Sequence, residues 1–275
     1  MPEGDTIFRA ARTLHRALAG KKVVAFESVF PALTRVHVDT PLTGQAVDSV
    51  SASGKHLLMR FSGGLVLRTH MRMNGSWHIY RPGERWQRSR RDMRIVVSTA
   101  DFVAVGFNIP VAEFITARNL PRHEELRRLG PDLLSDRFDT IEALARMRAR
   151  GHELVADVLL NQRVMAGIGN VYKSEVLFAC RVSPFAPIGA LDDQVLQCLI
   201  DTARRYLAAN VKPGRAPMTT YAGLRRTSGR DNPRERLWVY GRVGLPCRRC
   251  GTPISLKKHG PAARLTYWCS RCQKG

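Results

Sequence analysis

The second residue of the chain, Pro2, is the first candidate for chemistry. A small residue at this position ordinarily permits removal of Met1, and the freed proline then carries a secondary amine. An α-amino group has an unperturbed pKa of about 7.7 to 8.0, so an appreciable share is neutral and nucleophilic near pH 7. Such an amine can attack C1′ of a nucleotide sugar, displace the base and leave an iminium. The neighbouring Glu3 can pass protons to the opening sugar and take them back.

Two other readings of this start remain open on the residues alone. Pro2 and Glu3 also fit an ordinary, unreactive chain start. A chain that keeps Met1 has an amide nitrogen at Pro2, which is not a nucleophile.

Four of the six cysteines form two C-x-x-C pairs near the C-terminus, and residues 251–268 separate the pairs. This is the spacing of a four-cysteine zinc site. Four protein ligands leave no position for water, so we expect one structural Zn²⁺ rather than a catalytic one. Disulfides are the alternative, but the chain shows no secretion signal. The predicted ligands are Cys247, Cys250, Cys269 and Cys272.

The charge balance favours a polyanionic partner. Lys and Arg number 44 against 23 acidic residues, which gives a net charge of +21. A merely basic surface is the alternative. Residues 242–274 carry eight Lys or Arg and no acidic residue, which suits a hairpin that grips phosphates. No stretch approaches the roughly 18 to 20 apolar residues of a membrane span, so we expect a soluble, cytoplasmic protein. The sequence leaves the oligomeric state open, and a monomer is the default expectation.

The pattern of elements predicts an α+β fold in three parts. A helix over 5–20, capped by Asp5 or Thr6 and closed by Gly20, precedes β-rich runs between residues 23 and 107, which indicate a two-layered β-sandwich. The six arginines of 81–94 are predicted to lie on a long hairpin loop. Helical patterns follow residue 121, and Cys180 and Cys198 within them are predicted to be buried thiols. The helical segments are 124–129, 140–150, 152–161, 170–182 and 192–209.

These parts define the expected domains. Residues 1–120 form the N-terminal β-sandwich domain, 121–235 a helical domain and 236–275 a zinc-finger hairpin. Residues 211–233 are rich in Gly, Arg, Thr and Pro and are predicted to be a connector.

A glycine-containing turn joins two of the helical patterns. Gly167 and Gly169 permit a tight turn, and Asn170 begins the next helix, where unpaired N–H groups attract an anion such as a DNA phosphate. An ordinary helix corner with Asn170 as a cap is an equally good reading of these residues.

Four motifs in order resemble the signatures of the formamidopyrimidine-DNA glycosylase and endonuclease VIII family. They are MPEGDT, GKHLLMRF, QRVMAGIGNVYKSEVL, and VYGRVGLPCRRCG with RLTYWCSRCQK. The resemblance spans essentially the whole chain, and the PEG start is similar to the endonuclease VIII branch, which prefers oxidised pyrimidines. It implies an N-terminal helix with a β-sandwich, a helix-two-turn-helix and a zinc finger, acting on damaged DNA.

The resemblance also implies roles for individual residues. Pro2 matches the Schiff-base nucleophile and Glu3 the general acid. Lys55 matches a lysine that contacts phosphate and assists β-elimination. Asn170 and Arg264 match residues that hold the DNA backbone, and Arg264 also aids δ-elimination. One further DNA-contacting arginine is matched by Arg128.

A flipped nucleotide leaves a gap in the duplex, which the family fills with a short loop. Arg72, Met73 and Asn74 occupy the matching place, although Met73 also fits a core residue. These residues differ from the Gln-Leu-Tyr triplet of the better-known branch member, so its opposite-base preference is not carried over. Thr6 stands where the branch usually has glutamate, which predicts a changed lesion preference or lower activity.

Three functions fit the sequence. The leading one is a bifunctional glycosylase and AP lyase that favours oxidised pyrimidines and performs β- and δ-elimination. The second is the branch directed at oxidised purines. The third is a zinc-finger DNA-binding protein that has lost the chemistry.

Overall fold

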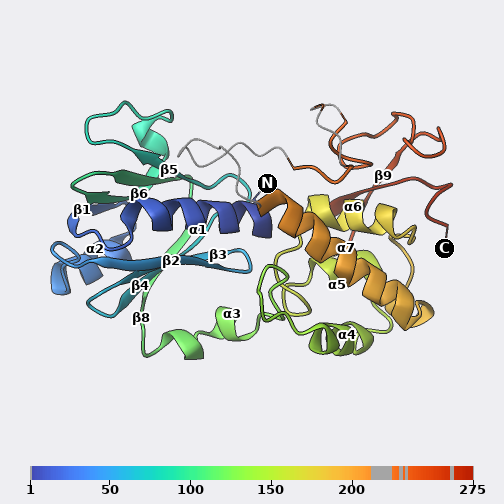
Figure 1. Ribbon diagram of the computed structural model, residues 1–275, viewed down its shortest axis with the longest axis horizontal. Coiled ribbons are helices and arrows are strands. Elements are labelled where there is room, and N and C mark those ends of the chain that lie inside the picture. The colour runs from blue at the N-terminus through green and yellow to red at the C-terminus, as the bar shows by residue number, and fades with distance from the viewer. Residues whose placement is uncertain (1, 212–224, 229–231, 233–234, 261–262, 275) are drawn as a thin grey trace. The chain divides into compact units, whose positions relative to one another are not determined.

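The computed structural model describes residues 2–211, 225–228, 232, 235–260 and 263–274 (Figure 1). The described residues divide into two compact units, one that ends at Arg128 and one that begins at Leu129. The predicted connector, 211–233, lies mostly outside the described residues. No helix in the described ranges is both long and apolar enough to cross a membrane.

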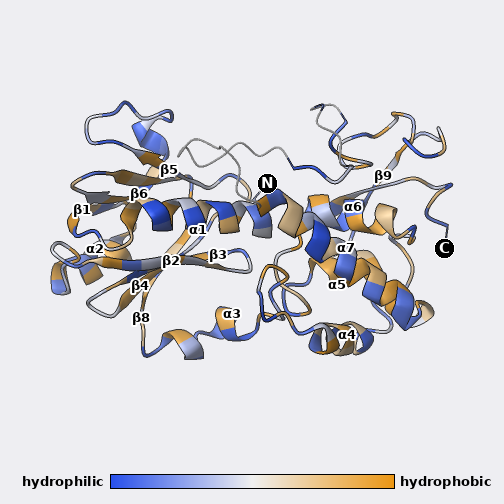
Figure 2. Cartoon of the chain, in the orientation of Figure 1, coloured by the Kyte–Doolittle hydropathy of each residue, from blue (hydrophilic) through white to orange (hydrophobic). Residues whose placement is uncertain are grey.

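The first unit begins with an amphipathic helix, α1 (Gly4–Leu18). Ile7, Leu14 and Leu18 lie on its buried side, whereas His15 and Arg16 are exposed, and Figure 2 shows the two kinds of residue alternating along the helix. The predicted cap at Asp5 or Thr6 is wrong, because the helix already begins at Gly4 with Glu3 in the N-cap position. Gly20 follows the helix with a φ of 77°, as its predicted role at the end requires.

Two four-stranded antiparallel sheets form the sandwich. One sheet has the order β2-β3-β4-β8 and the other β1-β6-β7-β5. Buried residues of α1 and of both sheets, including Leu14, Met59 and Ile95, share one hydrophobic core. The strands are β1 (Val23–Ser28), β2 (Val47–Ser53), β3 (His56–Phe61), β4 (Leu65–His70), β5 (Ser76–Tyr80), β6 (Met93–Thr99), β7 (Val103–Phe107) and β8 (Val111–Thr116).

A second helix of the unit, α2 (Pro31–Asp39), lies inside the stretch predicted to consist of β-rich runs, and it was not predicted. Pro31 stands in its first turn, where a missing N–H costs nothing, and Leu33 is its buried residue. Two short 3₁₀ helices, η1 (Arg90–Asp92) and η2 (Leu120–Arg122), and the helix α3 (Glu124–Arg127) complete the unit.

The prediction that 81–94 forms a hairpin loop is wrong. β5 and β6 are not neighbours, because β7 lies between them in the sheet, so the segment crosses over β7. Trp86 stacks on Tyr80 and meets the edge of Phe107, which holds the crossing against the outer face of the sheet. The error has a non-local cause, because the pairing of β7 with both β5 and β6 determines which strands are neighbours in the sheet.

Helices dominate the second unit, as predicted. They are α4 (Thr140–Arg148), α5 (Val155–Leu160), α6 (Asn170–Ala179), η3 (Ile188–Ala190) and α7 (Asp193–Val211). Residues 170–178 of α6 are all buried, so this helix forms the centre of the unit. Cys180 is half-buried and Cys198 is exposed, so the prediction of two buried thiols is wrong. α7 turns its Cys198 side outward and buries Leu196, Leu199 and Ile200 instead.

A two-stranded hairpin lies near the end of the described chain. It consists of β9 (Ser255–His259) and β10 (Arg264–Trp268), which pair antiparallel with Arg264 opposite His259. β10 packs against α6.

Candidate active site and nucleic-acid interface

The start of α1 is fixed by its own backbone. The Glu3 carbonyl accepts hydrogen bonds from the N–H groups of Thr6 at 2.9 Å and Ile7 at 3.1 Å. Pro2 is buried, and Glu3 is 0% exposed. Thr6 is also buried, and its hydroxyl donates to Asp5 at 3.4 Å. The first turn therefore holds residues 2 and 3 in one place.

Helix α1 runs antiparallel to β2. The backbone N–H of Val50 donates to His15 Nδ1 at 3.1 Å, and Ala19 pairs with Val47. From His15 back to the start of α1 is roughly 16 Å at a helical rise of 1.5 Å per residue. From Val50 to the end of β2 and its turn is about 13 Å at the rise of a strand. The start of α1 and the turn after β2 therefore lie at the same end of this unit, as Figure 1 also shows.

Lys55 occupies that turn. Ser53 and His56 pair at the end of the β2–β3 hairpin, so Gly54 and Lys55 alone form the connection. Gly54 has a φ of 55°, a left-handed conformation that glycine adopts without strain. The Lys55 side chain is half-buried, at the same end of the unit as Pro2 and Glu3.

A short loop joins β4 to β5 at this same end. His70, the last residue of β4, pairs with His56, which follows Lys55. Arg72, Met73 and Asn74 are all exposed, with Met73 53% exposed, whereas the flanking Met71 and Gly75 are buried. Met73 is therefore not a core residue.

Two hydrogen bonds close this loop. Gly75 N–H donates to the Met71 carbonyl at 2.9 Å, and Arg72 N–H donates to His70 Nδ1 at 3.0 Å. A Cβ at Gly75 would lie 2.5 Å from the Met71 oxygen, so only glycine fits. Arg72 has a φ of 48°, an uncommon conformation that the His70 contact helps to hold. The loop thus presents three side chains on a fixed backbone.

The two histidines beside Lys55 are kept neutral. Burial, reinforced by His70 and by Arg68, lowers the pKa of His56 to about 3. Burial and the charges of Arg72 and Lys55 lower the pKa of His70 to about 4. Neutral His70 has the lone pair on Nδ1 that the N–H of Arg72 requires.

Arg128 lies at the C-terminal end of α3, exposed and paired with Glu124 at 2.6 Å. The helix is tied to the sheet through Glu125, which pairs with the buried Arg68 of β4. Arg68 also holds Glu113 of β8 at 2.7 Å. This network fixes where α3 ends within the first unit.

In the second unit, Gln162 braces the glycine turn. Its Nε2 donates to the Ile168 carbonyl at 3.0 Å, and its Oε1 accepts from Gly167 N–H at 3.1 Å. Gly167 has a φ of 117°, which a side chain would strain. Gly169 is the N-cap and Asn170 the first residue of α6, so Asn170 is not a cap. Its amide instead donates to the Leu265 carbonyl of β10 at 2.8 Å.

Arg264 begins β10 and is exposed. Leu265, which Asn170 contacts, is the next residue of the same strand. The second unit therefore brings Asn170 and Arg264 together, while Pro2, Glu3 and Lys55 belong to the first.

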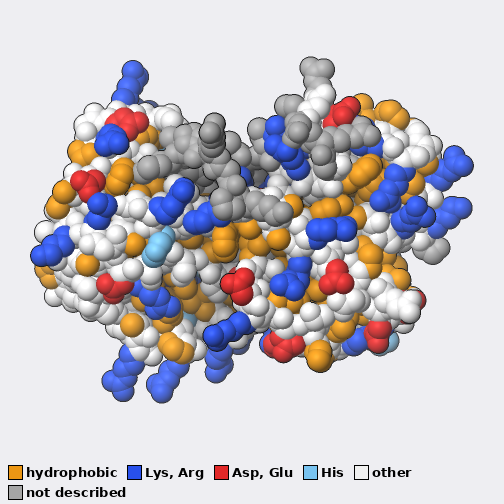
Figure 3. Space-filling view, in the orientation of Figure 1, with side chains coloured by type: hydrophobic (Ala, Val, Ile, Leu, Met, Phe, Trp, Pro, Cys, Tyr) orange, Lys and Arg blue, Asp and Glu red, His pale blue; other side chains and the backbone are white. Residues whose placement is uncertain are grey.

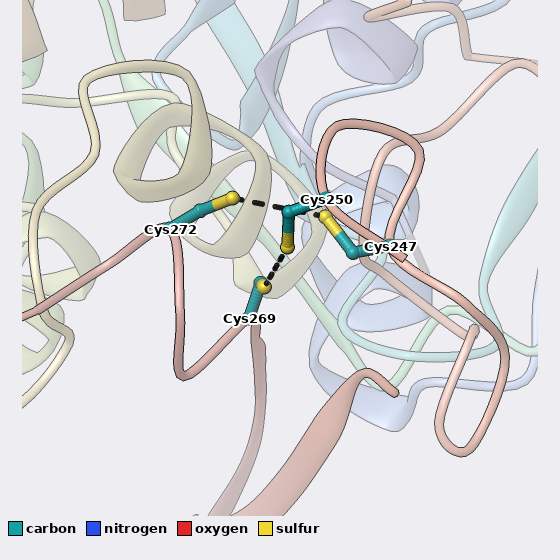
Figure 4. A group of neighbouring side chains, drawn as sticks. All are labelled: Cys247, Cys250, Cys269 and Cys272. Carbon is teal, nitrogen blue, oxygen red and sulfur yellow. Dashed lines mark hydrogen bonds between the residues drawn. The ribbon is translucent and has the colours of Figure 1, made fainter. Parts of the chain in front are cut away.

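The four predicted zinc ligands converge (Figure 4). Their sulfur atoms all lie within 4.8 Å of one another, with Cys247 to Cys272 at 3.9 Å and Cys250 to Cys269 at 3.4 Å. A tetrahedron with Zn–S bonds of about 2.3 Å needs S–S distances of about 3.8 Å. The cluster therefore has about the size that one zinc ion with four cysteine ligands requires.

Two buried charged residues of α6 were missed by the sequence analysis. Lys173 and Glu175 are both 0% exposed. Glu175 accepts the backbone N–H groups of residues 238–240 at 2.8 to 2.9 Å and the hydroxyl of Thr227, which ties the zinc-bearing segment to α6. Charged residues within the otherwise apolar stretch VYKSEVLF were the available signal.

The surface is strongly basic, as the composition predicts. Figure 3 shows Lys and Arg side chains distributed widely over the visible face, with fewer acidic side chains between them. Such a surface attracts a polyanion over a range of about a Debye length.

Three family models match successive parts of the chain. Residues 1–110 match the formamidopyrimidine-DNA glycosylase N-terminal domain, 129–222 the formamidopyrimidine-DNA glycosylase H2TH domain, and 244–275 the zinc finger found in FPG and IleRS. The fold predicted from the sequence is thereby confirmed. The zinc finger match and the cysteine cluster also confirm the predicted structural zinc site.

Relatives match over nearly their whole length. A probable endonuclease 8 2 of Streptomyces coelicolor is 41% identical, covering 100% of this chain and 95% of that protein. A DNA-(apurinic or apyrimidinic site) lyase Nei2 of Mycolicibacterium smegmatis is 37% identical, covering 99% of each. The fold is also that of a Lactococcus lactis formamidopyrimidine-DNA glycosylase bound to DNA with an AP site, with a TM-score of 0.83 and 24% identity over 100% of both chains.

Proposed function

Since the chain belongs to the formamidopyrimidine-DNA glycosylase and endonuclease VIII family, we propose that it excises oxidised bases, pyrimidines above all, through a Schiff base at Pro2. The Pro2 nitrogen bonds to C1′ while the glycosidic bond breaks, and Glu3 protonates the sugar oxygen as the ring opens to the iminium. Loss of the C2′ proton expels the 3′ phosphate, and a second elimination expels the 5′ phosphate. The product is a gap with phosphate at both ends.

The observation that carries this proposal is the meeting of three features at one end of the first unit. The fixed first turn of α1 holds Pro2 and Glu3, and the two-residue turn after β2 carries Lys55. The exposed loop 72–74 follows directly from β4, the strand beside β3. A nucleophile, a proton carrier and a cation for phosphate are what the reaction needs in one place.

Arg72, Met73 and Asn74 would fill the gap left by the flipped nucleotide. Their exposure on a closed, hydrogen-bonded loop supports this role, because a wedge must keep its shape while it displaces a base. The thioether of Met73 adapts to neighbouring bases, and the two polar residues can contact the unpaired base.

The second unit would hold the DNA backbone. Asn170 contacts Leu265, the neighbour of Arg264, so the two residues suit successive phosphates, and Arg128, at the end of the first unit, would contact a third. In terms of the three predicted domains, residues 1–120 would supply the chemistry, and residues 121–235 and 236–275 would bind the DNA backbone. The protein would act as a monomer on damaged DNA in the cytoplasm.

Borohydride trapping across a lesion panel tests the proposal. The protein, with its first residue verified by mass spectrometry, is incubated with duplexes that carry thymine glycol, 8-oxoguanine or an abasic site. We expect a covalent complex with the abasic and thymine glycol duplexes, because reduction of an iminium by borohydride leaves a stable amine bond between protein and DNA. A stronger band with 8-oxoguanine would assign the purine-directed function instead, and no band with any duplex would leave a DNA-binding protein without chemistry.

Replacement of Arg264 by alanine tests the phosphate contact. Each neutralised phosphate contributes about 0.9 to the slope of log K against log salt concentration, so Arg264→Ala should lower that slope by about one. Arg137→Ala removes an exposed arginine of the same unit to which we assign no role, and it should leave the slope unchanged. Equal slopes for Arg264→Ala and the unmodified protein would rule out the contact.

A further inference from the structure

Among the described residues, three oxygen atoms accept hydrogen bonds from the buried cation Lys173. Its ammonium group donates to Asn170 Oδ1 at 2.8 Å, to Thr266 Oγ1 at 2.7 Å and to the Leu265 carbonyl at 3.3 Å. The residue is 0% exposed. Burying a charge is costly unless hydrogen bonds compensate, and here three acceptors face the three N–H bonds of an ammonium group.

These contacts determine how the Asn170 amide points. An ammonium group can only donate and a backbone carbonyl can only accept. Asn170 must therefore turn its oxygen towards Lys173 and its nitrogen towards Leu265, where the hydrogen bond is 2.8 Å long. The opposite orientation would set donor against donor and acceptor against acceptor. The cation thus fixes the orientation of an amide that could otherwise flip.

The same contact strengthens the amide as a donor. A cation bonded to the oxygen of an amide draws electron density from its nitrogen, and linked hydrogen bonds polarise one another. The Asn170 NH₂ group has two hydrogens, of which the Leu265 carbonyl takes one. The described residues show no second acceptor for it, and Asn170 remains 5% exposed. The second hydrogen is suited to an anionic oxygen.

We propose that Lys173 is a positioning residue for DNA binding: it orients and polarises the Asn170 amide towards a phosphate and holds that amide in register with β10, which carries Arg264. Lys173 does not touch the DNA and acts through its neighbour. The inference rests on the proposed function, because it takes Asn170 to be a phosphate contact.

A double-mutant cycle tests the inference. Lys173→Met keeps the length of the side chain and removes the charge, and Asn170→Ala removes the group through which Lys173 acts. Affinity is measured by fluorescence anisotropy with a duplex that carries a tetrahydrofuran abasic analogue. We expect Lys173→Met to weaken binding about tenfold, the usual worth of a charge-assisted hydrogen bond. In the Asn170→Ala background the same change should have less than about a twofold effect.

Lys257→Met is the matched control. Lys257 is exposed on β9, directly opposite Thr266, so its loss removes one positive charge from the same hairpin, and no hydrogen bond joins it to Asn170 among the described residues. Any effect of Lys257→Met on affinity should be the same in the unmodified protein and in the Asn170→Ala background.

Lys173→Arg, which keeps the charge and the donors, should bind within about threefold of the unmodified protein.

Three results would overturn the inference. An equal loss for Lys173→Met with and without Asn170 would make Lys173 merely structural. Unchanged affinity of Lys173→Met would also refute it. If Asn170→Ala alone leaves affinity unchanged, there is no effect for Lys173 to relay, whereas the proposed enzymatic function is decided separately by borohydride trapping.

A further variant covers the case in which Lys173→Met does not fold. Zinc content and thermal unfolding identify that case. Thr266→Val then removes one acceptor of Lys173 while Asn170 keeps both of its partners, and we expect about a threefold loss of affinity. This loss should again disappear in the Asn170→Ala background, and its persistence would refute the inference.

Discussion

Pro2→Gly should abolish most base excision while leaving DNA affinity nearly unchanged. Loss of a covalent nucleophile can cost as much as about 10⁶-fold in kcat. Glycine keeps a primary amine at the chain start, so we expect a smaller fall, on the order of 10² to 10³-fold. The measurements are single-turnover release of thymine glycol and the Kd for a tetrahydrofuran duplex. An unchanged Kd is expected because the proposed phosphate contacts lie elsewhere in the chain.

The same proposal predicts that any residue left in front of Pro2 silences the chemistry. A protein with an uncleaved Met1 has an amide at Pro2, and its free α-amine is displaced by one residue from the buried position of the proline nitrogen. Such a preparation should give no trapped complex but should still bind the abasic analogue.

Pro31→Gly provides the matched control for the proline change. It makes the same replacement at the exposed start of α2, to which we assign no role in the reaction, and should leave excision unaltered. An undiminished trapped band for the Met1-bearing protein would show that an amine other than that of residue 2, such as a lysine, forms the imine.

Local signals predicted most of the elements, and long-range pairing was responsible for the errors. The apolar stripe of α1 and the runs that became β3, β4 and β6 are visible in the sequence because side-chain periodicity is a local property. The placement of β7 between β5 and β6 is not local, so the arginine-rich crossing was mistaken for a hairpin. α2 was missed because its few residues bury only Leu33 and show little periodicity.

The residues of the candidate site also divide into those with a local sequence signal and those without one. The zinc ligands could be predicted because C-x-x-C spacing itself encodes the turn geometry. Lys173 and Glu175 could not, because their partners lie far along the chain, at Leu265 and Thr266 for the lysine and at residues 238–240 for the glutamate. A buried charge within an apolar helix signals that a partner exists, but only the fold identifies it. The resemblance to a family supplied Lys55 and Arg264, which carry no local signal of their own.

Removal of zinc should unfold the hairpin and weaken DNA binding on the order of 100-fold. The core around the cysteines is small, with Phe178, Val239, Ile254 and Tyr267 as its buried residues besides Cys247 and Cys269. Because this small core cannot offset the conformational entropy that the segment loses on folding, the metal must supply most of its folding free energy. Without β10, the proposed contacts of Arg264 and Asn170 are both lost, and each is worth about tenfold.

Hydrogen exchange and trapping separate this effect from a loss of chemistry. After chelation, or in Cys269→Ser, residues 244–274 should lose protection from exchange while β3 and β4 of the first unit keep theirs. Trapping on the abasic duplex should recover when protein concentration is raised about 100-fold, because Pro2 is intact and only affinity has fallen. Cys198→Ser, a change at an exposed cysteine outside the cluster, should alter neither zinc content nor binding. Protected β9 and β10 amides in zinc-free protein would mean that the hairpin is held by packing against α6 rather than by its metal.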